Sequence, residues 1–169
     1  AKKGEGGQPG VSAGQVGKVG NGRAGAPENC NVGPKVKRTV LDGRREVFEA
    51  GGPYEWHYAE ALAFGSLLLE NIPVRLSGQD SRRGTFSTRH AFIYDAKTVA
   101  PYMPLLHLAP DQSRLCIYNS LLSEAAVLCF DSGYSLDYPN LPCLWEAQFG
   151  AFANAAPARH HPFICSGPH

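Results

Sequence analysis

The sequence predicts an α/β fold in three layers, with helices on both faces of a mostly parallel sheet. Residues 72–76 and 141–145 are short apolar stretches with the length of buried strands, and stretches with helical spacing of apolar residues alternate with them. A chain of 169 residues suffices for one ordinary domain and a tail. Alternation of this kind is typical of parallel sheets that are covered on both sides.

The composition excludes several classes of function. The 16 Lys and Arg residues nearly balance the 15 Asp and Glu residues, so no overall field attracts nucleic acid or an anionic membrane. No apolar run reaches the roughly 18 residues that a membrane helix needs. The 5 cysteines include no C-x-x-C pair, which favours reduced thiols over a disulfide framework or a zinc site. We therefore expect no nucleic-acid partner, no membrane partner and no metal site.

Residues 1–33 differ from the rest of the chain. They contain ten of the 19 glycines and few large apolar side chains. Ordering a backbone costs about 1–2 kcal/mol per residue, and this segment has little apolar surface to offset that cost. The composition predicts a disordered tail or linker, followed by one domain over residues 34–169.

Two helices are expected next. Residues 34–50 predict a short amphipathic helix that is interrupted at Gly43, and residues 54–70 predict a stronger one that Asn71 ends. The apolar side chains available to the first helix are Val36, Val40, Leu41 and Val47. The core candidates of the second are Trp56, Leu62, Phe64, Leu67 and Leu68.

The strand at residues 72–76 leads through Ser77 and Gly78 into a polar loop. This loop carries Arg82, Arg83 and Arg89, and strands of open α/β sheets place functional groups at this end. The arginines suit either of two interpretations. They are solvated surface charges, or they form a loop that binds phosphate or an acidic ligand.

The remaining elements are shorter. Residues 91–94 predict a strand and residues 95–114 a proline-rich loop. A helix should begin at Asn119 or Ser120, run to about Asp131 and stop at Gly133. The strand at residues 141–145 follows, and a further helix should start at Phe149.

Glu124 is the most informative single residue. On a helix its neighbours three and four positions away are Ser120, Leu121, Val127 and Leu128, so its carboxylate lies largely in an apolar stripe. A carboxylate in such a stripe needs a partner, because unpaired burial of its charge is costly. The alternative is an acid in the first turn of a helix, which the helix dipole favours by about 0.3–1 kcal/mol.

Four blocks of residues occur in an order typical of one family. They are AEALAFGSLL at residues 59–68, SGQDS, RGTF and RHA within residues 77–91, YNSLLSE at residues 118–124, and LWEAQFG at residues 144–150. Over roughly residues 34–167 the chain resembles the thiamine diphosphate-dependent first component of the 2-oxoglutarate dehydrogenase complex. The resemblance implies a pyrimidine-binding domain.

The resemblance also implies roles for individual residues. Glu124 matches the glutamate that hydrogen-bonds a ring nitrogen of the aminopyrimidine and so promotes loss of the thiazolium proton. Leu122 would pack on the pyrimidine, Phe152 would stack on it, and Gln79 would lie beside the cofactor. The implied reaction is decarboxylation of 2-oxoglutarate. For Leu122 and Phe152 ordinary core packing is the alternative.

The chain departs from the family after residue 150. Ala151 replaces an aspartate, and Pro157 and Pro162 interrupt the expected helix; the pair His160 and His161 is expected to be solvent-exposed rather than a metal site. The chain is expected to be a C-terminally truncated domain that holds half a cofactor site, while a separate domain binds the diphosphate through Mg²⁺.

Partners and location follow from the same resemblance. The expected partners are 2-oxoglutarate, the diphosphate-binding domain of the same enzyme in a homodimer, and a lipoyl-bearing acyltransferase. The expected location is the bacterial cytoplasm or the mitochondrial matrix. The alternative function is a non-catalytic dimerisation or interaction module derived from this domain, which Ala151 and the two prolines would support.

Overall fold

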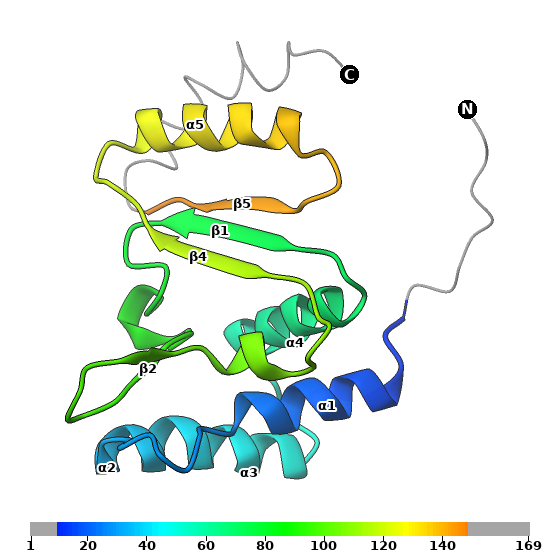
Figure 1. Cartoon of the computed structure of the whole chain (residues 1–169), viewed down its shortest axis with the longest axis vertical. Helices are drawn as coiled ribbons and strands as arrows, with labels where there is room; N and C mark the ends of the chain where they lie inside the picture. Colours follow the sequence, from blue (N-terminus) through cyan, green and yellow to red (C-terminus); the bar gives the residue numbers. More distant parts are fainter. Residues whose placement is uncertain (1–9, 149–169) are drawn as a thin grey trace.

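The computed structural model describes residues 10–148. Its central sheet has three parallel strands in the order β4-β1-β5, comprising β1 (Val74–Gly78), β4 (Leu115–Asn119) and β5 (Cys143–Glu146). Helix α5 (Glu124–Asp137) lies on one face of the sheet and helix α4 (Trp56–Leu69) on the other (Figure 1). The predicted three-layer α/β/α fold is confirmed.

The first strand begins two residues later than expected because the end of α4 occupies the chain up to Ile72. Asn71 adopts the left-handed conformation with φ 61°, as its position after the helix predicts. Its N–H donates to the carbonyl of Leu68 at 3.1 Å, and the N–H of Ile72 donates to that of Leu67 at 2.9 Å. These two bonds satisfy carbonyls that the helix end leaves free, and β1 then runs to Gly78.

The core lies between α4 and the sheet. Leu68 and Val74 are almost completely buried, and the core cluster includes residues from α1, α4, β1 and β4. Phe64 is buried and Leu62 and Leu67 are partly buried, as expected. The prediction that Trp56 belongs to the core is wrong. It is the first residue of α4, where the helix has not yet reached the sheet, and it is 92% exposed.

The glycine-rich segment contains a helix, α1 (Ala13–Arg23), where the composition predicts disorder. Its start is a capping box. The Ser12 hydroxyl accepts from the N–H of Gln15 at 3.2 Å, and the Gln15 side chain accepts from the N–H of Ser12 at 3.3 Å. The prediction of a structureless tail is therefore wrong for this stretch, and residues 1–9 lie outside the described part.

Small residues let α1 pack closely. Val19 is completely buried against Gly65 of α4, and a Cβ on Gly65 would overlap its side chain. A Cβ on Gly20 would likewise overlap the ring of Phe48 in α3. The glycines that raise the entropic cost of ordering the segment therefore also permit the contacts that offset this cost.

Residues 34–49 form one helical stretch, made of α2 (Pro34–Val36), the π-helical η1 (Lys37–Asp42) and α3 (Gly43–Glu49). The predicted interruption at Gly43 is wrong, because this residue has helical φ and ψ of −59° and −37°. The predicted apolar face is confirmed, since Leu41 is buried and Val36, Val40 and Val47 are half-buried.

Between β1 and β4 the chain forms short elements outside the main sheet. Strand β2 (Ile93–Tyr94) pairs antiparallel with β3 (Pro101–Tyr102), so the expected strand forms but does not join the parallel sheet. The short helices η2 (Thr85–Ser87) and η3 (Pro104–His107) flank this pair along the chain.

Helix α5 begins and ends later than expected. Asn119 does not cap a helix, because β4 extends through this residue and pairs it with Gly78. Helix α5 starts at Glu124 and continues past Gly133 to Asp137. The sequence pattern predicts no strand at β4, and the inclusion of its apolar residues in the sheet displaces the helix start by about one turn.

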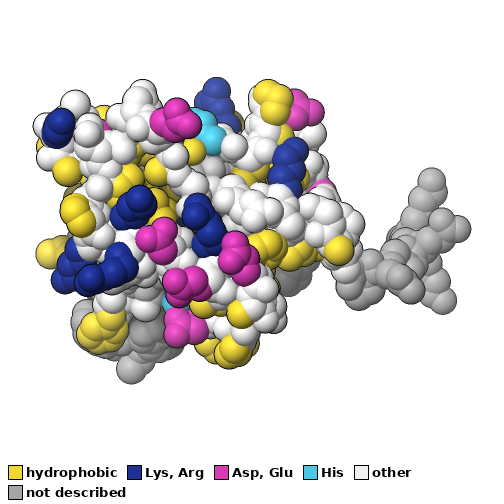
Figure 2. Space-filling model, turned by 90° about the horizontal axis from the view of Figure 1, so that it is seen from below, with side chains coloured by type: hydrophobic (Ala, Val, Ile, Leu, Met, Phe, Trp, Pro, Cys, Tyr) yellow, Lys and Arg dark blue, Asp and Glu magenta, His cyan; other side chains and the backbone are white. Residues whose placement is uncertain are grey.

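The surface formed by the helices at the foot of Figure 1 carries side chains of both charges close to one another (Figure 2). No described helix is long and apolar enough to cross a membrane. Within residues 10–148 no group of three or more His, Cys, Asp and Glu side chains has the arrangement of a metal site.

Candidate functional site

Two of the predicted site residues meet at the carboxyl end of the sheet. Gln79 follows β1 directly, and Glu124 is the first residue of α5. The Gln79 Nε2 donates to the Glu124 Oε1 at 3.1 Å, and both side chains are half-buried. The fold thus joins residues that are 45 positions apart in the sequence.

The sheet register explains this proximity. Gly78 of β1 pairs with Asn119 of β4, and the Ser120 N–H donates to the Gly78 carbonyl at 2.8 Å. Parallel strands that are in register end at the same edge, so the residues after β1 and after β4 must lie near one another. Four residues after Ser120 the chain reaches Glu124.

Glycine is required where β1 ends beside β5. A Cβ on Gly78 would lie 2.6 Å from the carbonyl oxygen of Glu146 and 2.6 Å from the Ser81 hydroxyl. Both distances are shorter than van der Waals contact, so any side chain would push the strand ends apart. The glycine of the SGQDS block therefore sets the position of Gln79.

Gln148 fixes the backbone of the same loop. Its Nε2 donates to the Gln79 carbonyl at 2.7 Å and to the Thr85 hydroxyl at 3.2 Å. No periodic pattern or charge cluster in the sequence points to this residue. Its place in the LWEAQFG block was the one available signal, because a periodic pattern carries no information about contacts this distant.

Arg89 holds the loop onto the sheet and α4. Its Nε donates to Glu60 at 2.6 Å, and its Nη1 donates to Glu146 at 2.6 Å and to the Ser81 carbonyl at 2.7 Å. Burial acts to lower the pKa of Arg89, but the bonds to the two glutamates outweigh burial and raise the pKa above its usual value.

The three loop arginines do not share one ligand site. Arg89 forms ion pairs with two glutamates, and Arg83 forms an ion pair with Asp80 at 2.8 Å on the surface. The Arg82 guanidinium lies over the Phe92 ring at 4.8 Å and donates to the Ile117 carbonyl at 3.2 Å. The contacts of Arg82 and Arg89 are those of structural residues, whereas Arg83 is the exposed surface charge of the other interpretation.

The surroundings of Glu124 differ in part from the expected apolar stripe. Val127 and Leu128 are half-buried one turn along α5, whereas Ser120 and Leu121 precede the helix. Leu122 is 78% exposed beside Glu124. Phe152 lies outside the described residues, as do Ala151, Pro157, Pro162 and the adjacent histidines. The roles of all four site residues remain predictions.

The geometry leaves Glu124 able to accept a further hydrogen bond. Within the described part of the chain, Gln79 is the only side chain that donates to its carboxylate. A carboxylate has about four lone-pair sites, so most of its accepting capacity is free. An exposed leucine beside such a carboxylate suits a planar heterocycle that has one apolar face and one polar edge.

Comparison with known proteins identifies the family. The model of the transketolase pyrimidine-binding domain matches residues 53–168, which is more than half of the chain. The chain belongs to this family. The fold class and the resemblance identified from the four blocks are thereby confirmed.

The most similar individual proteins include members of the family that the four blocks resemble. Over 141 residues, which is 83% of this chain, 45% are identical to the 2-oxoglutarate dehydrogenase E1 component of Geobacillus kaustophilus (strain HTA426). Over 158 residues, which is 94% of this chain, 42% are identical to the 2-oxoglutarate dehydrogenase E1 component of Bacillus mycoides (strain KBAB4). The chain spans 15% and 16% of the length of these two relatives, respectively.

The second alignment corrects one boundary. A match over 94% of the chain must include most of residues 1–33, which the resemblance had left outside the family region. Residues of this segment form α1 and pack on α4. The start of the family region at residue 34 was therefore placed too late.

Proposed function

We propose that this chain supplies the aminopyrimidine side of a thiamine diphosphate site in a 2-oxoglutarate dehydrogenase. Glu124 is the residue that hydrogen-bonds the aminopyrimidine ring. The observation that carries the proposal is the Gln79–Glu124 contact of 3.1 Å at the carboxyl end of a parallel sheet. Homology to the 2-oxoglutarate dehydrogenase E1 components supports the choice of cofactor and substrate.

The residues present fit the cofactor. Glu124 offers a carboxylate with free accepting capacity, and Gln79 donates to it and so fixes its orientation. Leu122 presents an apolar surface for the ring, and Phe152 is assigned the stacking role. The cofactor, when bound, serves as the electron sink for decarboxylation. The Glu124 carboxylate would accept the hydrogen bond of the protonated ring nitrogen and so share one proton with it.

The proposal extends to partners and location. Mg²⁺ and the diphosphate are assigned to a diphosphate-binding domain, which meets this domain in a homodimer. The acyl group passes to a lipoyl-bearing acyltransferase. The cysteines of the described part are free thiols, which supports a reducing compartment such as the bacterial cytoplasm or the mitochondrial matrix.

The test is Glu124→Gln in a protein that provides the diphosphate-binding domain together with this chain. The amide keeps the size of the side chain but cannot supply a carboxylate to the ring nitrogen. Proton transfer of this kind contributes about 10²–10⁴-fold, so we expect deuterium exchange at the thiazolium carbon of bound cofactor to slow at least 10²-fold. Turnover of 2-oxoglutarate should fall with it.

Asp137→Asn is the matched control, because it also changes an acid to its amide on α5 but at the exposed end of the helix. It should leave exchange and turnover unchanged, and both variants should keep the thermal midpoint of the parent within a few degrees. Exchange within a few-fold of the parent in Glu124→Gln would show that Glu124 is only a helix-start acid.

A non-catalytic interaction module is the second candidate. Leu121 and Leu122 are both about four-fifths exposed, and adjacent exposed leucines favour a protein–protein contact surface. If this module is the function, the chain should associate with a second copy or a partner domain without cofactor. Association should then be unchanged in Glu124→Gln and lost in Leu121→Asp.

A further inference from the structure

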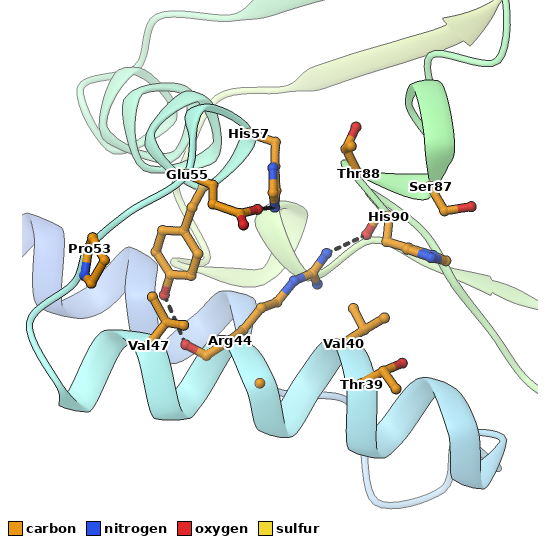
Figure 3. Close-up of a pocket in the computed structure, with 12 residues that line it drawn as sticks. Thr39, Val40, Arg44, Val47, Pro53, Glu55, His57, Ser87, Thr88 and His90 are labelled. Atoms are coloured by element: carbon orange, nitrogen blue, oxygen red, sulfur yellow. Dashed lines mark hydrogen bonds and ion pairs between the residues drawn. The ribbon is translucent and has the colours of Figure 1, made fainter.

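A cavity of about 420 Å³ lies away from Glu124, between three segments of the chain. These are the helical stretch of η1 and α3, the start of α4 and the loop between β1 and β2 (Figure 3). The polar side chains that line it are Thr39, Arg44, Glu55, His57, Tyr58, Ser87, Thr88 and His90. We refer to this cavity as the Arg44 pocket. Its volume is in the range of small-molecule sites.

Arg44 is buried at the base of the pocket without an acidic partner. Its Nη2 donates to the carbonyls of Arg89 at 2.9 Å and His90 at 2.8 Å, and its Nη1 donates to that of Arg23 at 3.4 Å. In the described part of the chain all its hydrogen bonds go to neutral backbone oxygens. Its positive charge therefore has no matching negative charge.

A second buried cation lies beside it. The Arg23 guanidinium stacks over the Tyr58 ring at 4.6 Å, and among the described residues its Nη1 has no hydrogen-bond partner. Burial, followed by repulsion from Arg23, lowers the pKa of Arg44 to about 9. Burial likewise lowers the pKa of Arg23 to about 10. The surroundings thus disfavour both charges, and a nearby anion would stabilise them.

The acids near these arginines are already engaged or lie in solvent. Glu60 binds Arg89 through both carboxylate oxygens. The Glu55 side chain is 80% exposed and contacts the His57 Nε2 at 3.4 Å. Figure 3 shows Arg44 reaching from its helix toward the His90 carbonyl, with Glu55 and His57 above it in that view. The base of the pocket therefore keeps an excess of positive charge.

The remaining polar groups of the pocket can donate hydrogen bonds without adding charge. Burial is the main cause that lowers the pKa of both His57 and His90, and nearby arginines lower it further. Each imidazole is therefore neutral near pH 7 and offers one N–H donor. The His57 Nε2 contacts the exposed Glu55 carboxylate at 3.4 Å, so an anion that binds His57 there must displace Glu55. The hydroxyls of Thr39, Ser87 and Thr88 add donors on the opposite walls.

We propose that the Arg44 pocket binds a small molecule through a phosphate or carboxylate group, which lies against the Arg44 guanidinium and the His57 imidazole. Either group matches the excess positive charge and the neutral donors around it. Val40, Val47 and Pro53 supply apolar contacts for the rest of the molecule. The pocket shares no lining residue with the Gln79–Glu124 site.

The test uses this chain with inorganic phosphate and with succinate as probes. Ionic strength is kept constant with sodium chloride, and glycerol is the uncharged comparison. Proton and carbon NMR signals of the imidazoles report binding. We expect a saturable shift at His57 and His90 with a dissociation constant in the millimolar range or below, and no shift at His107. Response to phosphate alone or succinate alone identifies the group that the pocket prefers.

His57→Asn and His107→Asn form a matched pair, because His107 lies outside the pocket and stacks on Tyr102 at 4.7 Å. His57→Asn should weaken binding at least tenfold, whereas His107→Asn should not change it. Val47→Trp fills the pocket without changing its charge and should abolish saturation. A linear response up to 50 mM of both probes, or equal binding by the two histidine variants, would overturn the proposal.

Discussion

Replacement of Asp131 by asparagine tests the contact that joins α5 to the sheet. The Asp131 carboxylate is only 4% exposed and accepts from Arg75 of β1 at 3.1 Å and 2.9 Å, as well as from the Ser77 hydroxyl. Asp131→Asn removes the negative charge but leaves the Arg75 guanidinium in place, where it is 13% exposed. Breaking a buried pair in this way costs about 3–5 kcal/mol.

The lower end of that range is expected, because Arg75 keeps other favourable contacts. Its guanidinium also lies 4.8 Å from the ring centres of Tyr118 and Tyr134. These cation–π contacts do not depend on Asp131. For a domain of this size, about 3 kcal/mol corresponds to a loss of about 6–12 °C in the thermal midpoint.

The assay is thermal and urea unfolding of the parent, Asp131→Asn, Arg75→Met and the double variant. Asp137→Asn, the same change at an exposed position of α5, is the control and should change the free energy of unfolding by less than about 0.5 kcal/mol. The double variant should cost clearly less than the sum of the two single variants, because neither charge is then left unpaired. A loss below about 1 kcal/mol in Asp131→Asn, or additive single effects, would refute the reasoning.

Two further predictions concern the first helix and acid stability. Gly65→Ala should destabilise the chain by about 1–3 kcal/mol in urea unfolding, because its methyl group would overlap Val19. Gly14→Ala is the control and should not destabilise the chain, because Gly14 has open space around it. Equal stability of the two variants would contradict the packing of α1 on α4. Hydrogen bonds, foremost from the Asn31 backbone, hold the pKa of Asp95 well below its usual range. The stability from this lowered pKa is present above about pH 3.9 and is lost as the pH falls further, so Asp95→Asn should have a flatter acid-unfolding profile than the parent. An unchanged profile would refute this assignment.

The periodic patterns predicted those elements whose apolar residues face one core. Strands β1 and β5, helix α4 and the left-handed Asn71 all lie within two residues of their expected positions. Strand β4 was missed because it follows a proline-rich loop and leads within a few residues into a helix. Trp56 was misplaced because helical periodicity does not show at which turn a helix first contacts the sheet.

Helix α1 shows a different limit. Glycine content measures the entropic cost of ordering a segment, but it does not measure how closely the segment can approach another helix. Gly20 and Gly65 permit close packing of α1 because the side chains of Phe48 and Val19 fill the space that a Cβ on each glycine would occupy. That complementarity is between segments about 30–45 residues apart, so no local pattern contains it.

The candidate site could be predicted in part. Glu124 and Gln79 were identified through the family blocks, and the structure places them 3.1 Å apart. The spacing in the sequence did not require this contact. It depends on the register that aligns Gly78 with Asn119, and a shift of one residue would turn the side chains to the other face of the sheet.

The arginines illustrate why charge alone does not identify a ligand site. Arg89 stands in a loop that suggested ligand binding, yet its charge is neutralised by Glu60 and Glu146, which are 29 and 57 positions away. Arg44 and Arg23 lie in helical segments for which the sequence predicts no ligand site. In the described structure both are buried, and no acid is bonded to them. A residue's availability for a ligand is thus decided by the acids that the fold brings to it. For this reason the Arg44 pocket, rather than the three arginines of the loop after β1, is the proposed place where an external anion would bind.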